Sequence, residues 1–383
     1  MFKCIDEIKI EGKRIFMRLD FNVPLAFENG KARVTDDTRI REAIPTIEHA
    51  LKRGAQLILA SHLGRPKPLA DGGRDPLFSM EPVAERLQEL INADVLLSED
   101  VVGDGVEMMV KQMKSAQVVV LENLRYHPEE EANDPEFCRQ LASLAEIYIS
   151  DAFGTTHRKH ASTYGVPQIM QPRGIGFLIK KELNFLTRLL ENPGHPYVAI
   201  LGGSKVSDKI KTIEKLYMQV ETVLIGGAMA HAFTIAKGDT IPEKAKQPKR
   251  EEVECAKMLL EKATRHDVKL LIPIDTNEGF DIGPKTTDLF CKEIASSKTV
   301  FWNGPLGMFE KPEYAVGSFA VAKAIAESSA LKVIGGGDTV SCVVQSGYAD
   351  KMDHISTGGG ACLEFLEGEG LPGVEILRDY SKK

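Results

Sequence analysis

Short apolar segments alternate with longer amphipathic segments along almost the whole chain. The apolar segments are rich in Val, Ile and Leu, which is typical of strands buried on both faces of a parallel sheet. The segments between them repeat apolar residues at helical spacing. In 79–91, for example, Val83, Leu87 and Leu90 share one face and Ser79 is placed to cap the helix. This alternation predicts an α/β fold with doubly wound parallel sheets.

The strand pattern occurs in two halves. We expect strands at 14–19, 55–60, 94–97, 118–121 and 146–150 in the first half, and at 197–201, 222–226, 269–274, 299–302, 332–336 and 354–357 in the second. Near 165–195, Pro and Gly flank a helical pattern, which favours a rigid connecting helix over a flexible linker. We therefore predict a first domain over 1–167, a connecting segment over 168–193 and a second domain over 194–364.

Composition and charge narrow the class of protein. The chain has 383 residues, a net charge of −7 and six cysteines without a C-x-x-C pair. The acidic balance disfavours a nucleic-acid binder, and scattered cysteines fit a reducing compartment. The sequence shows neither a run of 18 apolar residues nor the apolar region of a signal peptide. We expect a cytoplasmic protein that has no membrane partner and is a monomer.

The segments that follow the first-half strands carry basic residues. Ligands of open parallel sheets bind at the carboxyl ends of the strands, where these segments meet. The basic residues at these ends are His62, Arg65, Arg125, His157 and Arg158, and the segment 35–45 adds Arg39 and Arg41. Arginine forks suit bidentate binding of carboxylate or phosphate. We therefore predict a basic pocket for a small polyanion, rather than unrelated surface charges.

Glycine turns follow the second-half strands, at 202–205, 226–229, 302–307, 335–339 and 357–361. Glycine lets backbone N–H groups approach a ligand closely, and helix starts favour anions. We therefore predict that this sheet edge binds a nucleotide. The dinucleotide fingerprint G-x-G-x-x-G is not met, because Val340 stands where its last glycine belongs, and this disfavours a nicotinamide dehydrogenase.

The turn at 202–205 leads into a positively charged segment. We expect Ser204 to cap a helix there, with Lys205 and Lys209 on one helix face because they are four residues apart. The G-x-x-x-x-G-K-[ST] spacing of the nucleotide P-loop is absent. The residues alone leave two alternatives open: a phosphate site of another kind, or a tight turn followed by a solvated helix.

Long motifs are distributed, in order, over nearly the whole chain: RLDFNVP, TDDTRI, SHLGRPK, ENLRYHPEE, DAFGTTHRKHAST, GGSKVSDKI, WNGPLGMFE, GGGDTVS and STGGGACLEFLEG. Together they resemble the phosphoglycerate kinase family. The resemblance implies two domains whose sheets face each other across a cleft. It also implies reversible phosphoryl transfer between ATP, with Mg²⁺, and 3-phosphoglycerate, giving ADP and 1,3-bisphosphoglycerate in glycolysis or gluconeogenesis. In-line transfer would follow hinge-bending closure of the domains.

The resemblance implies roles for residues of the first domain. The substrate ligands would be Asp20, Phe21, Asn22, Arg39, His62, Leu63, Gly64, Arg65, Arg125 and Arg158. Arg39 would also be catalytic, because it would lie beside the acyl group and stabilise the migrating phosphoryl. The attacking carboxylate is ionised near pH 7, so no general base is required. On this interpretation His62 binds the substrate phosphate and does not shuttle protons.

The resemblance also implies roles in the second domain. The nucleotide ligands would be Gly203, Lys205, Lys209, Gly226, Gly227, Gly279, Asn303, Glu310, Gly336, Gly337, Asp338 and Thr339. Asp338 would hold Mg²⁺ and Glu310 would bind the ribose hydroxyls. Lys205, Lys209, Gly359 and Gly360 would be catalytic at the phosphoryl in flight. The resemblance therefore favours the phosphate site at the turn 202–205.

The tail, about 365–383, resembles a return segment that packs back on the first domain and would make that domain discontinuous. Two departures stand out. Ser204 occupies a position where alanine is usual, and 271–287 lacks most of a longer excursion beside the adenine pocket. The second departure predicts a more open base pocket, with weaker nucleotide affinity or looser base selectivity. A non-enzymatic binding protein on the same fold is the alternative, although the charged residues of the transfer site are present.

Overall fold

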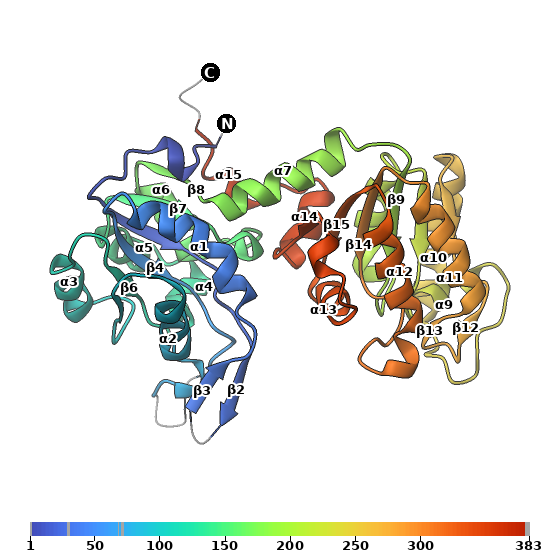
Figure 1. Cartoon of the computed structure of the whole chain (residues 1–383), viewed down its shortest axis with the longest axis horizontal. Coiled ribbons are helices and arrows are strands. Elements are labelled where there is room, and N and C mark those ends of the chain that lie inside the picture. Colours follow the sequence, from blue (N-terminus) through green and yellow to red (C-terminus); the bar gives the residue numbers. More distant parts are fainter. Residues whose placement is uncertain (1, 29–30, 68, 70–72, 380–383) are drawn as a thin grey trace. The chain divides into compact units, whose positions relative to one another are not determined.

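The computed structural model describes residues 2–28, 31–67, 69 and 73–379. The chain forms two compact units, Met1–Leu183 together with Gly370–Lys383, and Asn184–Glu369. Each unit contains one six-stranded parallel sheet flanked by helices (Figure 1). The predicted α/β fold with two parallel sheets is therefore confirmed.

In the first unit the strand order is β5-β6-β4-β1-β7-β8, and all neighbouring pairs are parallel. The strands of this sheet are β1 (Arg14–Arg18), β4 (Gln56–Ala60), β5 (Val95–Leu97), β6 (Val118–Val120), β7 (Ile147–Ser150) and β8 (Arg173–Ile175). A separate hairpin consists of β2 (Leu25–Glu28) and β3 (Lys31–Val34). The helices are α1 (Thr38–Leu51), α2 (Glu81–Leu90), α3 (Asp104–Lys111), α4 (Pro128–Ala132), α5 (Pro135–Ser143), α6 (Val166–Ile169) and α15 (Pro372–Glu375).

In the second unit the strand order is β11-β10-β9-β14-β15-β16, again with parallel pairs throughout. The strands are β9 (Tyr197–Leu201), β10 (Thr222–Ile225), β11 (Lys269–Leu271), β14 (Thr299–Asn303), β15 (Leu331–Gly335) and β16 (His354–Ile355), with a hairpin of β12 (Thr276–Asn277) and β13 (Asp281–Ile282). The helices are α8 (Ile210–Leu216), α9 (Ala230–Ala236), α10 (Arg250–Arg265), α11 (Pro284–Ala295), α12 (Val316–Glu327), α13 (Gly337–Gln345) and α14 (Gly360–Leu366). The boundary between the units falls within α7 (Phe177–Glu191).

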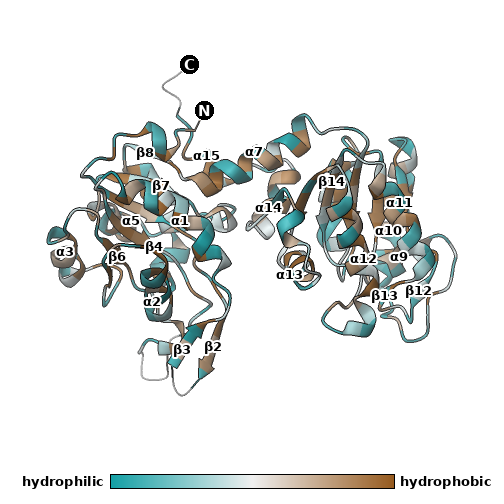
Figure 2. Cartoon of the chain, viewed as in Figure 1, coloured by the Kyte–Doolittle hydropathy of each residue, from teal (hydrophilic) through white to brown (hydrophobic). Residues whose placement is uncertain are grey.

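The central strands are buried on both faces, which explains their unbroken apolar sequences. Every residue of β9 and of β14 is buried. Figure 2 shows the strands as brown ribbons, β4 and β14 among them, while teal is found mainly on the helices and loops around them. In the second unit Ile200, Trp302 and Ile334 pack with helix residues such as Phe290 and Val321 in one buried cluster. The apolar area removed from water in such cores is the main driving force of folding.

Each expected strand segment contains a strand, but the edge strand β8 lies in the segment that we had assigned to the domain connection. Its sequence has no apolar run, and it contains Gly174 next to a proline segment. A Cβ at Gly174 would lie 2.5 Å from the carbonyl oxygen of Lys3, and Ile175 N donates to that same oxygen at 2.9 Å. Close backbone approach, which sequence periodicity does not report, defines this strand.

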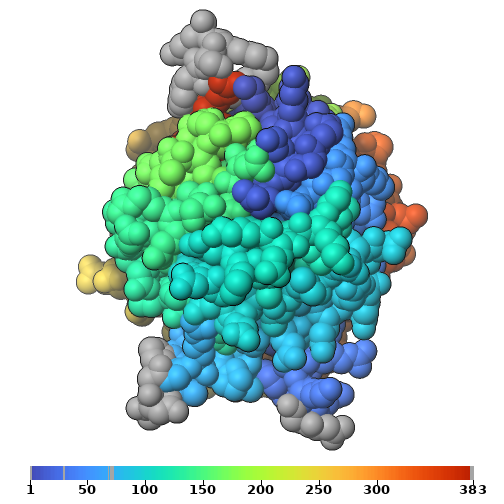
Figure 3. Space-filling model, turned by 90° about the vertical axis from the view of Figure 1, so that its left-hand side faces the viewer, coloured from blue at the N-terminus to red at the C-terminus, as the bar shows by residue number. Residues whose placement is uncertain are grey.

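The C-terminal segment 370–379 packs on the first unit. Gly373 N donates to Thr156 O at 2.8 Å, and Phe2 and Arg378 form an antiparallel bridge. In Figure 3 the red C-terminal residues lie beside the blue N-terminal residues on the surface of this unit. Within the described ranges, no helix is both long and apolar enough to span a bilayer.

The N-terminus of α7 is held by a buried carboxylate. Asp151, which follows β7 and is fully buried, accepts a hydrogen bond from Ile179 N at 3.0 Å and from the hydroxyl of Thr46 at 2.5 Å. The Thr46 hydroxyl oxygen accepts in turn from Phe177 N at 2.9 Å. Burial raises the pKa of Asp151 to about 7, although these hydrogen bonds act in the opposite direction. Helix α1 and strand β7 are thereby joined to the first turn of α7.

Replacing Thr46 by valine should lower the free energy of unfolding by about 1–3 kcal/mol, because it leaves a buried carboxylate oxygen and the Phe177 N–H without this partner. Urea denaturation followed by circular dichroism measures the loss. Thr38→Val is the matched control, since the Thr38 hydroxyl bonds Asp36 at the exposed start of the same helix. Equal losses in the two variants would show that the buried hydroxyl has no special importance.

Candidate active site

The loops at three strand ends of the first unit are joined by hydrogen bonds from one loop to the next. Phe21 N donates to the Ser61 hydroxyl at 2.8 Å, and Gly64 N donates to the Asn22 side-chain oxygen at 2.8 Å. Leu63 N donates to the side-chain oxygen of Asn123 at 3.1 Å. The segments after β1, β4 and β6 therefore form one continuous surface, as expected at the carboxyl edge of a parallel sheet.

Arg39 reaches this surface from α1. Its Nη1 lies 2.8 Å from Oδ2 of Asp20, and about a third of the arginine side chain is exposed, at 36%. Burial would raise the pKa of Asp20, but nearby positive charge, that of Arg39 above all and also that of Arg18, outweighs this cost and holds its pKa below the ordinary value. The carboxylate therefore stays ionised at neutral pH, and Arg39 keeps exposed N–H groups that can bind an anion.

His62 lies behind this ion pair and is 5% exposed. Its Nδ1 lies 3.3 Å from Nη2 of Arg18, a residue that we did not predict. Burial lowers the pKa of His62 to about 3, and Arg18, Arg125 and Arg158 act in the same direction, whereas Asp20 opposes them. The imidazole is therefore neutral at pH 7.

Three further predicted arginines line one pocket of about 690 Å³, namely Arg65, Arg125 and Arg158. Arg125 Nη1 donates to Gly64 O at 2.5 Å, and Nε of Arg158 donates to Nε2 of His157 at 3.1 Å. Arg65 is exposed. The structure therefore brings the predicted basic residues of the four strand ends together, with an open space beside them.

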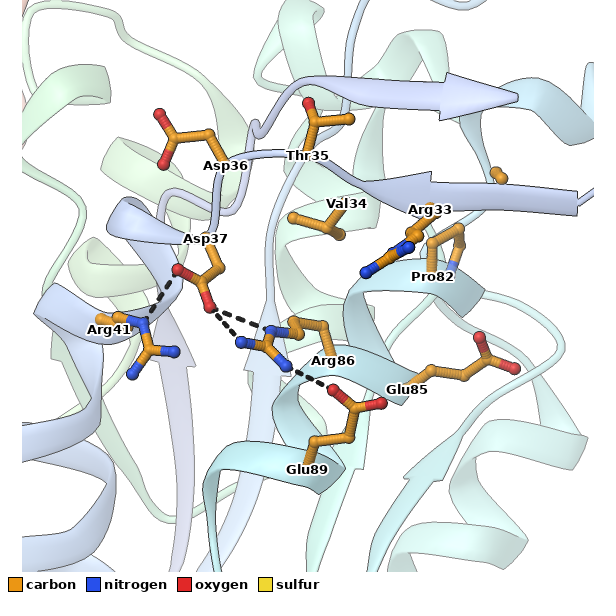
Figure 4. Close-up of a pocket in the computed structure, with 11 residues that line it drawn as sticks. Arg33, Val34, Thr35, Asp36, Asp37, Arg41, Pro82, Glu85, Arg86 and Glu89 are labelled. Atoms are coloured by element: carbon orange, nitrogen blue, oxygen red, sulfur yellow. Dashed lines mark hydrogen bonds and ion pairs between the residues drawn. The ribbon is translucent and has the colours of Figure 1, made fainter. Parts of the chain in front are cut away.

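A second pocket of the first unit, about 540 Å³, lies between β3, the start of α1 and α2 (Figure 4). Its charged side chains pair with one another: Asp37 bonds both Arg41, at 2.9 Å, and Arg86, at 2.6 Å, and Arg86 also contacts Glu89. Arg41, which we had grouped with the basic residues, belongs to this network. Apart from Arg41, the pocket contains none of the predicted residues, so it is a weaker candidate for the polyanion.

In the second unit the glycine turns contact one another through their backbones. Gly203 N donates to Pro305 O at 3.1 Å, and Gly227 N donates to Leu306 O at 3.0 Å. Gly227 has φ +64°, and a Cβ there would lie 2.7 Å from the backbone N and O of Gly203. Gly226, equally, would place a Cβ 2.3 Å from Leu306 Cδ2. Glycine is required at 227 by conformation and by space, and the turns after β9, β10 and β14 meet there.

Lys209 is buried against β14. Its Nζ lies 3.2 Å from Asn303 O and also contacts the Asn303 side-chain oxygen. The residue is 9% exposed. Burial lowers the pKa of Lys209 to about 8, while Asp338 acts in the opposite direction. Asn303 and Lys209, two predicted nucleotide ligands, are therefore in contact, and the ammonium is poorly hydrated.

The expected helix start at Ser204 is wrong. A 3₁₀ turn begins at Ser207 and α8 begins at Ile210, so Lys205 lies in the preceding loop, where it is exposed. Ser204 is not the residue that precedes the first helical turn. The two lysines consequently share no helix face: one is exposed and the other buried. Lys205 lies in a loop and Lys209 ends a 3₁₀ turn, so their four-residue spacing does not arise from α-helical periodicity.

The start of α13 carries several predicted residues. Gly336 precedes the helix with φ +88°, Gly337 and Asp338 are exposed in its first turn, and the Thr339 hydroxyl accepts from Gly304 N at 2.6 Å. Glu310 is exposed after β14. At the start of α14, Gly359 has φ +52° and Gly360 is exposed. Together these elements supply backbone N–H groups and two exposed carboxylates, those of Asp338 and Glu310, in the segments that follow β14, β15 and β16.

The side chains present fit a magnesium ion that is bound mainly by the phosphate oxygens of a nucleotide and by water. Among the described residues, no group of three or more His, Cys, Asp and Glu side chains could hold a metal. One exposed carboxylate, Asp338, stands at the N-terminus of α13. Mg²⁺ in nucleotide sites commonly uses one or two carboxylates together with phosphate oxygens and water. Asp338 therefore suits a nucleotide-bridged ion, and not an ion held by protein side chains alone.

Comparison with known proteins agrees with this geometry. The family model for phosphoglycerate kinase matches residues 5–278 and 275–369. The chain belongs to the phosphoglycerate kinase family. A phosphoglycerate kinase of Anaeromyxobacter dehalogenans (strain 2CP-C) is 48% identical over 400 residues, covering 98% of this chain and 99% of the relative. One of Acidobacterium capsulatum is also 48% identical, with 98% of both chains covered.

Solved structures of the phosphoglycerate kinase family have the same fold. The enzyme of Coxiella burnetii matches with a TM-score of 0.85 and 35% identity, covering 98% of this chain and 99% of its own. That of Pyrococcus horikoshii matches with a TM-score of 0.80 and 30% identity, covering 98% of each chain. The predicted membership of a kinase family that transfers phosphoryl groups is confirmed.

Two findings locate the segment that is shortened in this chain. The Anaeromyxobacter alignment extends over 400 residues although this chain has 383, so the relative has residues that this chain lacks. The two matches of the family model meet at 275–278. There the chain makes the small hairpin β12–β13, in which Glu278 bonds Lys244 at 2.6 Å and the Tyr314 hydroxyl at 2.8 Å.

Gly279 lies at the tip of this hairpin with φ +84°. It lines, with Gly227 and Leu306, a space of only about 20 Å³, and a Cβ at Gly279 would lie 2.5 Å from Ala245 Cβ. Gly279 and Gly227, both predicted nucleotide ligands, therefore line the same space. The enclosed space that they line is small, and the more open base pocket stays a prediction.

Residues that sequence reasoning missed are found behind the basic cluster. Arg18, Asn123, Glu130 and Ser162 are all buried. The signal was weak but present: Arg18 is a charged residue at the end of an apolar strand, and buried charges need a partner. The other three lie within quoted motifs in which we had assigned roles only to neighbouring residues.

Proposed function

We propose that this chain catalyses reversible phosphoryl transfer between ATP and the carboxylate of 3-phosphoglycerate, giving ADP and 1,3-bisphosphoglycerate. Membership of the family supports the reaction. The observation that supports it most directly is the clustering of predicted arginines beside His62 at one sheet edge, with a pocket of about 690 Å³ beside them. The phosphate of 3-phosphoglycerate is close to a dianion near pH 7, and its charge suits this arginine lining.

In the first unit, Arg65, Arg125 and Arg158 would bind the phosphate of 3-phosphoglycerate. Asp20 and Asn22 would bind the hydroxyl and carboxyl end, since both lie in the loop after β1. Arg39 would bind the reacting carboxylate and then the transferring phosphoryl, because its ion pair with Asp20 places the guanidinium at this edge. Phe21, Leu63 and Gly64 would contribute backbone and packing around the ligand.

In the second unit, the glycine turns would surround the nucleotide and leave its phosphates beside Lys205 and Lys209. Glu310 would bind the ribose, and Asp338 would hold Mg²⁺. When bound, the ion neutralises negative charge on the nucleotide phosphates. The remaining donors would be the lysine ammonium groups and the backbone N–H groups of Gly359 and Gly360, which favour developing charge on the phosphoryl.

The chemistry needs positioning and charge neutralisation more than proton transfer. The nucleophile is a carboxylate that is already ionised, so a neutral His62 is consistent with a binding role. Direct in-line transfer requires the two ligands to come into contact, so we propose that the units close during turnover around the segment that contains α7. We also propose that the protein works as a monomer in the cytoplasm.

Replacing Arg39 or Lys205 by alanine should lower kcat by about two to three orders of magnitude, because each removes a cation from the transferring phosphoryl. The assay supplies ATP, Mg²⁺ and 3-phosphoglycerate and couples the bisphosphate product to its reduction. Arg41→Ala and Lys211→Ala are matched controls, since these exposed residues pair with Asp37 and Glu369.

A wild-type protein that binds ATP but shows no turnover would reject the kinase assignment in favour of a binding protein on the same fold. Equal losses of kcat in the variants and their controls would show that Arg39 and Lys205 do not act at the transfer site. The kinase reaction of the wild type would still stand.

A further inference from the structure

A buried polar network lies behind His62 and has no part in the function proposed above. It consists of Arg18 in β1, Glu130 in α4 and Ser162 in the turn 161–165. Their exposed fractions are 1%, 1% and 0%. Burying a guanidinium and a carboxylate is costly unless both are paired and hydrogen-bonded. Arg18 of this pair contacts His62, one of the predicted substrate ligands, so the pair is placed to act on His62.

The hydrogen bonds of this network run from Arg18 through Ser162 to Glu130. Arg18 Nε donates to the Ser162 hydroxyl oxygen at 2.8 Å, and that hydroxyl donates to Oε1 of Glu130 at 2.5 Å. Ser162 N donates to Oε2 of Glu130 at 2.9 Å, and the Tyr148 hydroxyl fixes the Ser162 carbonyl at 2.8 Å. Burial raises the pKa of Glu130, but the charge of Arg18 and the bonds from Ser162 oppose it. Both carboxylate oxygens accept hydrogen bonds, which fits the ionised form.

The other end of the network contacts His62. Arg18 Nη2 lies 3.3 Å from His62 Nδ1. A guanidinium has donors and no acceptor, so Nδ1 must accept this hydrogen bond and carry no proton. In a neutral imidazole the single proton then lies on Nε2. The opposite tautomer would place two N–H donors against each other at Nδ1.

We propose that Arg18, Ser162 and Glu130 are positioning residues that hold His62 in the Nε2–H tautomer, so that its free nitrogen donates a hydrogen bond to the anionic substrate. This inference rests on the proposed function, in which His62 binds 3-phosphoglycerate. With the proton on Nδ1 instead, Nε2 would present a lone pair to the anion and repel it. The network therefore decides whether this neutral histidine attracts or repels the ligand.

The first test needs no variant and no turnover. Protein labelled with ¹⁵N-histidine should show, for His62 at pH 7 and again at pH 5, an unprotonated Nδ1 and a protonated Nε2. A proton on Nδ1, or a ring that becomes charged between pH 7 and pH 5, would overturn the proposal. Because this measurement is made without substrate, it stays interpretable even if the kinase assay fails.

The second test removes the network and reads the substrate contact. Glu130→Gln should raise the KM for 3-phosphoglycerate about tenfold while leaving the KM for ATP unchanged, and the His62 ring signals should shift toward a mixture of tautomers. Ser162→Ala, which breaks the same path, provides a second variant if Glu130→Gln does not fold. Glu129→Gln is the matched control, since Glu129 is the exposed neighbour in the same helix.

A purely structural role predicts a different result. The variants would then lose thermal stability while the His62 tautomer and the ratio of the two KM values stayed at the values of Glu129→Gln. That outcome would reject a positioning role even if the wild-type tautomer were as expected.

Discussion

Lys209→Met is expected to lower kcat by about two to three orders of magnitude. The lysine is nearly buried, and its ammonium group lies against the main-chain and side-chain oxygens of Asn303. Such a poorly hydrated cation interacts strongly with a phosphoryl group that gains charge during transfer. The coupled kinase assay measures the loss. Lys211→Met, which removes an exposed lysine of α8, is the control and should retain wild-type activity.

The same substitution has a second signature in stability. Burial lowers the pKa of Lys209 to about 8 from 10.5, so the folded chain binds fewer protons than the unfolded chain between those values. The free energy of unfolding of the wild type should therefore rise as the pH rises through this window, by at most about 3 kcal/mol. Lys209→Met should lose this rise. Denaturation curves at pH 7.5 and pH 10 measure it, and a wild-type slope equal to that of the variant would contradict the buried, charge-destabilised lysine.

The sheets could be predicted from sequence because their central strands are buried on both faces. An unbroken apolar run such as 197–201 has few other interpretations in a chain that alternates strands with helices. The site residues followed from the same reasoning, since the loops after parallel strands must meet at one edge. Hence His62, Arg125 and Arg158 could be grouped before any contact was known.

The failures have local causes. Edge strand β8 depends on the close approach of Gly174 to Lys3 and has no apolar signal. Lys205 and Lys209 were wrongly predicted to share one helix face, because a spacing of four in the sequence does not distinguish an α-helix from a loop followed by a 3₁₀ turn. Arg18 was missed because its importance depends on partners in three other elements, which periodicity cannot reveal.

Gly227→Ala is expected to cost both stability and nucleotide binding. Alanine at φ +64° loses about 1 kcal/mol from its backbone conformation alone. The new methyl group would also lie 2.7 Å from the backbone N and O of Gly203 and 2.9 Å from Pro305 O, which are rigid atoms of the turns after β9 and β14. Separating these turns should bring the total loss in free energy of unfolding to about 2–4 kcal/mol and raise the KM for ATP at least tenfold.

Gly238→Ala separates the two causes of the loss. Gly238 also has a positive φ, +91°, but a Cβ there meets no atom within 4 Å. This variant should lose only the conformational part, about 1 kcal/mol, and should keep the KM for ATP. Urea denaturation and the kinase assay measure both quantities. If the two variants lost equal stability, the close contact of the three turns would contribute nothing to the fold. If Gly227→Ala kept its KM for ATP despite a larger loss of stability, these turns would hold the unit together without binding the nucleotide.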